Sequence, residues 1–188
     1  AGMWQITPIT ANAMGLRVDG HYDGRLDVPA SANAVMKLLT AYHDQFHDWR
    51  VADYAYHAGS SATAKFIAKH GMPPAEPTIP AWPARNVTRQ HLTKLLAIAC
   101  VVREPARFGV SLPTLPRAQH LVQVPIARSI PIALAADHAG MSVDMLTHYN
   151  AAFRGDTINA GTAAYLLLPA SHARQFRAAL LDPANAMA

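Results

Sequence analysis

The chain has 188 residues, of which 51% are hydrophobic and 15% are charged. This composition excludes an intrinsically disordered protein, and the length suffices for one sizeable core or two small ones. The formal net charge of +4 favours anionic partners. The Lys and Arg residues are scattered, however, and no basic run carries interleaved aromatic residues, so we expect no nucleic-acid partner. The longest apolar run, residues 95–102, is too short to span a bilayer.

Three helices are predicted in the first half of the chain. Residues 31–42 show apolar residues at helical spacing, with Ser31 as the expected N-cap. A long helix is expected over residues 48–70, where small residues recur every three or four positions. Gly59 falls in its middle, which predicts that another helix or a ligand approaches the backbone there. Residues 87–102 form the third predicted helix.

Proline-rich segments divide the chain. Residues 71–85 hold five prolines and cannot be the interior of a helix. Residues 103–119 are predicted to be a linker. Beyond it the pattern predicts a strand, two helices, a second strand and a last helix, over residues 121–124, 132–139, 142–148, 164–169 and 171–181. Gly140 and Ser142 are the expected C-cap and N-cap between the two central helices.

The side chains that carry chemistry give few strong patterns. His43 and His47 are four residues apart, as zinc ligands on a helix often are, but no third ligand is obvious. We therefore expect no metal ion and no other cofactor. Cys100 is the single cysteine and lies in an apolar stretch, which excludes an internal disulfide and predicts a buried thiol. The two glutamates, Glu76 and Glu104, lie beside prolines and not in an apolar cleft that would raise a carboxyl pKa.

Several segments together resemble one family, the soluble-type lytic murein transglycosylases, and within it the membrane-bound D type. The order and rough spacing of the family motifs agree over residues 1–112. The matching segments are Gly-Met-Trp-Gln at residues 2–5, Asp-Gly-Arg-Leu-Asp at 23–27, Phe-His-Asp-Trp at 46–49, Ala-Tyr-His-Ala-Gly at 55–59, and Thr-Arg at 88–89. Residues 117–180 resemble a LysM module, with Asn150 at the end of its second helix.

The resemblance implies a mainly α fold. A lysozyme-like helical domain lacking its first helices is expected over residues 1–112. A small α+β LysM-like segment of β-α-α-β order, with a C-terminal helix, is expected over residues 117–188. Family members cleave the bond between N-acetylmuramic acid and N-acetylglucosamine without water, and one glutamate acts as acid and then as base to give a 1,6-anhydro product. LysM modules bind polymers of N-acetylglucosamine.

The resemblance also assigns a substrate-binding set. Gln5 would contact the substrate from the cleft wall, and Tyr56 would hold the catalytic glutamate. His57 stands where the family has an asparagine that contacts the sugar, and His91 stands at the position of a cleft tyrosine. An imidazole can replace part of the hydrogen bonding of an amide. The alternatives without a functional role are that Tyr56 is a core residue and that His57 is a solvated residue on the helix surface.

The catalytic glutamate of the family precedes the segment at residues 2–5, so we expect it upstream of Ala1. We therefore expect no catalytic residue in this chain, and no activity of the chain alone. Val87 replaces another glutamate of the family motif.

Three interpretations remain open: a transglycosylase fragment, a non-catalytic peptidoglycan-binding relative, and a generic basic helical domain with another partner. The first two imply peptidoglycan glycan strands as the partner, a monomer, and a place in the cell envelope, periplasmic or associated with the outer membrane. No signal-peptide pattern is visible in the chain itself.

Overall fold

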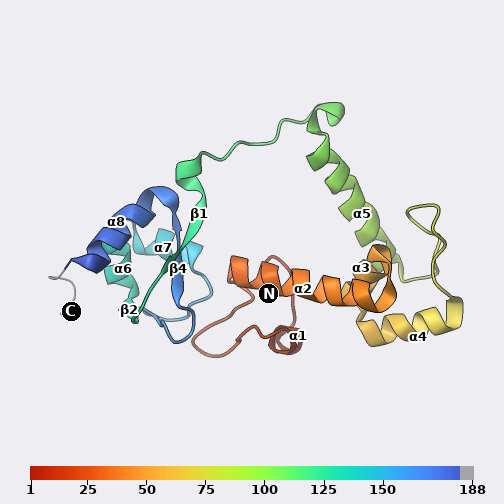
Figure 1. The fold of residues 1–188 in the computed structure, drawn as a ribbon, viewed down its shortest axis with the longest axis horizontal. Helices are drawn as coiled ribbons and strands as arrows, with labels where there is room; N and C mark the ends of the chain where they lie inside the picture. The colour runs from red at the N-terminus through yellow and green to blue at the C-terminus, as the bar shows by residue number, and fades with distance from the viewer. Residues whose placement is uncertain (183–188) are drawn as a thin grey trace. The chain divides into compact units, whose positions relative to one another are not determined.

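The computed structural model describes residues 1–182, which form a mainly helical fold with small antiparallel sheets, as predicted (Figure 1). Its contacts define two compact units. The terminal unit consists of residues 1–34 and the residues from 114 onward, and the helical unit consists of Val35–Pro113. These packing units group the chain differently from the predicted domains 1–112 and 117–188, which remain a prediction.

The second half of the terminal unit has the predicted order of strand, helix, helix and strand. Strand β1 (Leu121–Pro125) pairs antiparallel with β4 (Tyr165–Pro169), and Figure 1 shows the two side by side. Two helices follow β1 in sequence, α6 (Ile132–Ala139) and α7 (Val143–Tyr149). The remaining elements are the short pair of β2 (Ile130–Pro131) and β3 (Thr157–Ile158), the turn η2 (Arg117–Gln119), and the last helix α8 (Ala170–Leu181).

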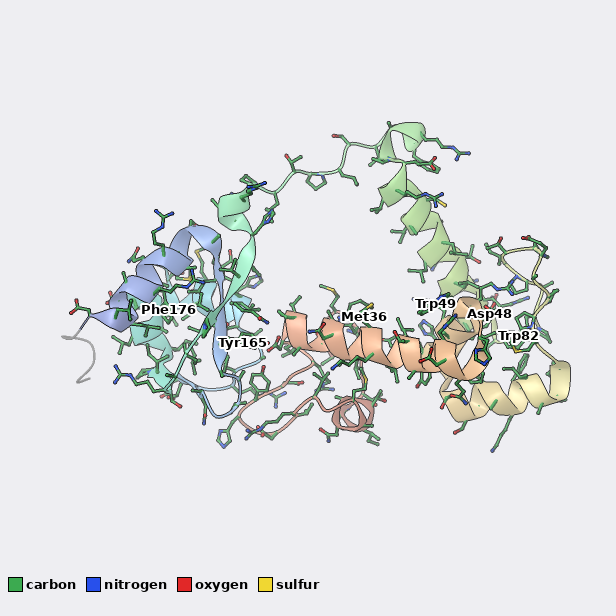
Figure 2. All side chains as sticks on the ribbon, viewed as in Figure 1. Met36, Asp48, Trp49, Trp82, Tyr165 and Phe176 are labelled. Carbon is green, nitrogen blue, oxygen red and sulfur yellow. The ribbon has the colours of Figure 1, made fainter. Side chains whose placement is uncertain are left out.

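The core of this segment is mainly aliphatic, with aromatic rings supplied by Phe153 and by Phe176 of α8. Alternate residues of the strands and one face of each helix are buried together, namely Val124, Ala135, Leu146, Leu166, Leu168 and Phe176 (Figure 2 labels Phe176). Helix α6 ends at Gly140, which has φ 63°, as its sequence predicts. A Cβ at this position would lie 2.7 Å from the Gln175 amide, so glycine also allows α8 to pack closely. Ser142 caps α7 by accepting a hydrogen bond from the Met145 N–H at 3.2 Å.

Asn150 joins the end of α7 to strand β4. Its side-chain amide donates to the carbonyls of Leu146 and Leu167, both at 2.9 Å. Its side-chain oxygen accepts from the Leu167 N–H at 2.8 Å. The Asn150 side chain thus behaves as an extra stretch of strand backbone beside β4, in a place where water is excluded.

We expect Asn150→Ala to lower the free energy of unfolding by about 2–3 kcal/mol, because it takes the side-chain partners from the buried N–H and carbonyl of Leu167 and removes one hydrogen bond to the Leu146 carbonyl. The matched control is Asn159→Ala, since Asn159 is exposed and caps only the N–H of Gly161. Urea unfolding of both variants measures the difference. An equal loss in both variants would contradict the role of Asn150.

The first part of the terminal unit is held to this segment by Asp23. Its carboxylate is 1% exposed and forms ion pairs with Arg25 at 2.7 Å and Arg154 at 2.8 Å. The Asp23 N–H donates to the carbonyl of Ala152 at 2.8 Å, and Tyr22 forms an isolated antiparallel bridge with Phe153. Residues that are about 130 positions apart in sequence are therefore joined by both backbone and side-chain bonds.

A second buried carboxylate, Asp27, lies four residues further on. It accepts hydrogen bonds of 2.5 Å from the hydroxyls of Tyr22 and Tyr165 (Figure 2 labels Tyr165). Its other oxygen accepts from the Ala30 N–H at 3.0 Å, at the start of helix α2 (Val28–Phe46). The predicted N-cap Ser31 is therefore wrong: Asp27 caps the helix, and the Ser31 hydroxyl donates to the carbonyl of Val28 at 3.2 Å.

Asp23 makes stability depend on pH in a defined direction. The Arg25 guanidinium holds the pKa of the Asp23 carboxyl below its usual value, against the opposing effect of burial. The contribution of Asp23 is thus fully present above the unfolded pKa, about 4, and is lost as the pH falls through the lower folded pKa. We expect Asp23→Asn to cost about 3 kcal/mol at pH 7 and progressively less below pH 4. Asp44→Asn, at an exposed carboxylate, is the control. The same deficit at pH 7 and in strong acid, measured by urea unfolding, would contradict this assignment.

The helical unit contains the rest of α2, then α3 (Trp49–Ala58), α4 (Ser60–His70), α5 (Asn86–Arg103) and the turn η1 (Pro105–Phe108). The predicted single helix over residues 48–70 is wrong, because it breaks at Gly59, with φ 86° and ψ 143°. Within residues 1–182, no atom outside Gly59 and its two chain neighbours lies within 4 Å of a Cβ built at this position. Glycine is needed there for its positive φ and not for a close approach of another helix or a ligand.

The proline-rich loop at residues 71–85 is anchored at both ends. The Arg50 guanidinium pairs with Asp48 at 2.6 Å and donates to three carbonyls of this loop at 2.9, 3.1 and 3.4 Å. The indole N–H of Trp82 donates to the carbonyl of Gly71 at 3.2 Å, which closes the loop. Trp82 is thereby placed in the core of the helical unit, among Phe46, Val51, Tyr54, Ala55 and Leu92.

Helix α5 packs on α3 near its own start, where Thr88 and Leu92 are buried. Most side chains of its second half are exposed, among them Ile98 at 63% and Val102 at 55%. The predicted burial of Cys100 is therefore wrong, since the thiol lies on this exposed part of the helix. Within residues 1–182, no helix is long and apolar enough to cross a membrane.

Candidate functional site

The candidate site lies on one face of helix α3 in the helical unit. The helix begins at Asp48, whose carboxylate accepts the N–H of Arg50 at 2.8 Å and that of Val51 at 3.4 Å. Asp53 and His57 are four residues apart on this helix, so their side chains lie on the same face. Helix α5 brings His91 against that face.

The three side chains form a compact cluster. His91 Nδ1 makes a hydrogen bond with Asp53 Oδ1 at 2.9 Å, and the ring centroids of His57 and His91 are 3.9 Å apart. The Asp53 side chain is 10% exposed, whereas the His91 side chain is 41% exposed and His57 lies at the surface. The second oxygen, Asp53 Oδ2, is buried and has no hydrogen-bond partner among the described residues. The cluster is thus closed on the carboxylate side and open on the imidazole side.

The electrostatics of the cluster follow from this burial. Burial raises the pKa of the Asp53 carboxyl, and the nearby imidazoles of His91 and His57 oppose that rise. Burial and the neighbouring His91 lower the pKa of His57. A neutral imidazole at His57 has one nitrogen that donates and one with a free lone pair, so it can bind a hydroxyl group or a cation.

The structure brings together three of the four predicted substrate-binding residues. Tyr56 is half-buried beside His57, with ring centroids 5.6 Å apart in an edge-on arrangement, and burial raises its pKa. The fourth residue, Gln5, belongs to the terminal unit. It is exposed, has φ 51°, and its side chain donates to the carbonyl of Gly2 at 2.7 Å. The role of these residues in binding substrate stays a prediction.

Asp53 is not among the residues predicted from the sequence, although it stands four residues before His57, the same helical spacing as that of His43 and His47. His43 and His47 do not share a helix face, because α2 ends at Phe46 and His47 has φ 54°. The His43 ring instead stacks on Trp49, at 4.1 Å between ring centroids. Within residues 1–182, Asp53, His57 and His91 are the group of side chains placed to hold a metal ion.

An apolar hollow of about 200 Å³ lies on another face of α3. It is lined by Tyr54 and Ala58 of α3, by Phe66 of α4 and by Trp82 (Figure 2 labels Trp82). The hydroxyls of Tyr54 and of Thr63, which also lines the hollow, are buried without a hydrogen-bond partner in the described part of the chain. This unit therefore offers an aromatic surface and a polar cluster on neighbouring faces of one helix.

Neither glutamate is placed for acid catalysis. Glu76 is exposed in the proline-rich loop, and Glu104 is an exposed partner of Arg103 and Arg107, at 3.5 and 3.3 Å. As the sequence predicts, neither carboxyl lies in an apolar cleft.

Comparison with known families agrees with this fold. Residues 1–78 match the family described as "Transglycosylase SLT domain". Residues 120–185 match the family described as "Lytic transglycosylase MltD, LysM-like domain". The chain is thus similar to lytic transglycosylases of the SLT type in its first part and has a LysM-like match behind it, in the order that the resemblance implied.

Two relatives are the membrane-bound lytic murein transglycosylases D of Escherichia coli K12 and of Escherichia coli O6:H1. Each is 33% identical to this chain over 181 residues, which cover 96% of this chain. The chain spans 40% of the length of these relatives.

We expect His91→Ala to lower the free energy of unfolding by about 1–3 kcal/mol, because the buried Asp53 carboxyl loses its hydrogen bond. His21→Ala, at an exposed histidine, is the control and should change stability by less than about 0.5 kcal/mol. Urea unfolding in a metal-free buffer measures both. Equal stability of the two variants would show that the pair contributes nothing.

Proposed function

We propose that this chain binds the glycan strands of peptidoglycan and is the substrate-binding part of a lytic transglycosylase. That reaction is a non-hydrolytic cleavage between N-acetylmuramic acid and N-acetylglucosamine that gives 1,6-anhydro-muropeptides. The observation that carries the proposal is the succession of an SLT match and a LysM-like match in one chain. The relatives named above are murein transglycosylases by name, which supports the same substrate.

The substrate-binding side chains in this proposal are Gln5, Tyr56, His57 and His91. His57 is exposed and His91 is partly exposed, and the imidazole nitrogens not bonded to Asp53 can donate to or accept from sugar hydroxyls. Tyr56 supplies an aromatic edge beside them. The rings are inclined to one another, at 85° for Tyr56 and His57 and at 55° for His57 and His91, so they offer both ring edges and ring nitrogens to a sugar.

We also propose that the chain alone does not cleave glycan. The reaction needs a carboxyl with a raised pKa beside the scissile oxygen. The two glutamates are exposed on the surface. Asp53 has a raised pKa but is enclosed, and its Oδ1 is bonded to His91. We therefore assign no catalytic acid or base among residues 1–182.

A second candidate function is that of a non-catalytic peptidoglycan-binding relative. It is favoured by the departures from the family motif at His57, Val87 and His91. Val87 is 64% exposed and offers no polar atom to a substrate. Both candidates place the protein in the cell envelope, as a monomer with glycan and not nucleic acid as its partner.

The test is incubation of the chain with purified sacculi. We expect the protein to sediment with the sacculi and mass spectrometry to find no 1,6-anhydro-muropeptides, because no acid–base carboxyl faces the site. Release of such products would overturn the proposed inactivity. Absence of sedimentation would overturn the proposed glycan binding and favour the generic helical domain.

Variants at His57 test the proposed contact. His57→Ala should weaken sedimentation several-fold, because a side chain that bonds sugar hydroxyls is removed. His57→Asn installs the amide found in the family motif and should keep or strengthen it. His21→Ala is the matched control at an exposed histidine of the terminal unit. Identical sedimentation of all four proteins would exclude His57 from the contact.

A further inference from the structure

We propose that Asp53, His57 and His91 form a binding site for one divalent transition-metal ion, with Zn²⁺ as the best fit. The three residues come from two helices, α3 and α5, so the ion would bridge them. This inference goes beyond the proposed glycan binding and does not depend on it.

The geometry suits a small ion. Each residue offers one ligand atom, and these atoms lie within 4.8 Å of one another. Zinc bonds to nitrogen and oxygen at about 2.0–2.2 Å, so ligand atoms of a tetrahedral site are about 3.4 Å apart. The 2.9 Å between His91 Nδ1 and Asp53 Oδ1 would open slightly. Ligand atoms that now lie up to 4.8 Å apart would have to approach to about 3.4 Å, and His57, which is exposed, is the least constrained of the three side chains.

The chemistry of the donors selects the class of metal. Two imidazoles and a carboxylate suit zinc and its neighbours in the first transition row, whereas Mg²⁺ and Ca²⁺ prefer oxygen ligands throughout. The buried and unpartnered Asp53 Oδ2 supplies an independent indication of a missing ligand. A buried polar atom normally has a partner, and a carboxylate without one lowers its energy when a cation binds beside it.

The site is accessible to an ion from solvent. His57 lies at the surface and 41% of the His91 side chain is exposed, while the carboxylate forms the closed end. Three protein ligands leave a fourth position for water or for an oxygen of a bound molecule. The pair His43 and His47 lacks these features, because His47 lies beyond the end of α2.

The first experiment is calorimetric titration of the 188-residue chain with Zn²⁺ after treatment with EDTA. We expect one ion per chain with a dissociation constant below about 10 µM. At a hundredfold excess over that constant, the Tm should rise by about 5–10 °C, because the ion binds only the folded arrangement of α3 and α5. Co²⁺ should give the visible absorption of a tetrahedral nitrogen–oxygen site, and Mg²⁺ should give no effect. No saturable binding of Zn²⁺ would overturn the proposal.

Variants separate this site from adventitious binding to surface histidines. His57→Asn and Asp53→Asn should each weaken Zn²⁺ binding at least tenfold and abolish the Co²⁺ spectrum. The double variant with His43→Asn and His47→Asn is the matched control, and it should bind as the unchanged chain does. If Asp53→Asn fails to fold, as circular dichroism would show, the exposed His57→Asn still decides. Binding unchanged by His57→Asn would overturn the assignment.

The unchanged chain keeps this proposal distinct from glycan binding. After treatment with EDTA it is expected to sediment with sacculi as it does in the presence of Zn²⁺. Absence of Zn²⁺ binding in a chain that still sediments would overturn the metal site alone, and absence of sedimentation in a chain that still binds Zn²⁺ would overturn the glycan binding alone.

Discussion

The terminal unit depends on two buried carboxylates, Asp23 and Asp27. The first 27 residues contain a single short helix, α1 (Pro8–Ala13), and too little apolar surface to fold alone. Asp23 binds them to Arg154, and Asp27 binds Tyr165, so both join the start of the chain to the LysM-like segment. A buried carboxylate without partners raises the free energy of the folded state. Loss of one of these hydrogen bonds or ion pairs therefore weakens the packing that the others maintain.

The need to pair Asp23 and Asp27 explains the role of the family motif at residues 23–27, to which the resemblance alone assigned no role. In the run Asp-Gly-Arg-Leu-Asp, Arg25 neutralises Asp23 and donates to the carbonyl of Ile6, so it orders the segment before it. Asp27 then starts α2, the helix whose continuation leads to the helical unit. The motif therefore acts on the architecture. The chemistry of the candidate site comes from α3 and α5, which carry no part of it.

The sequence predicted best the elements whose ends have a distinctive residue. Gly140, Ser142 and Asn150 each act at a helix end as expected, because positive φ and side-chain capping are local requirements. The errors arose where two local causes give the same pattern. A glycine in a row of alanines fits both a close helix contact and a helix break, and only the backbone at Gly59 distinguishes them. The exposure of Cys100 depends on how far α5 extends past its neighbour, which periodicity does not reveal.

The candidate site was predictable only in part, for a related reason. A four-residue spacing places two side chains together only within one helix, so it holds for Asp53 and His57 and fails for His43 and His47. His91 joins the cluster through the packing of α5 on α3, a contact between residues 38 positions apart.

The family motif has an amide at the position of His57 and a phenol at the position of His91. Both positions carry imidazoles here, and these lie beside the buried Asp53 carboxylate. An amide or a phenol serves a sugar but is a poor ligand for zinc, whereas imidazole serves both. The same two substitutions that weaken the match to a glycan cleft therefore create a set of metal ligands.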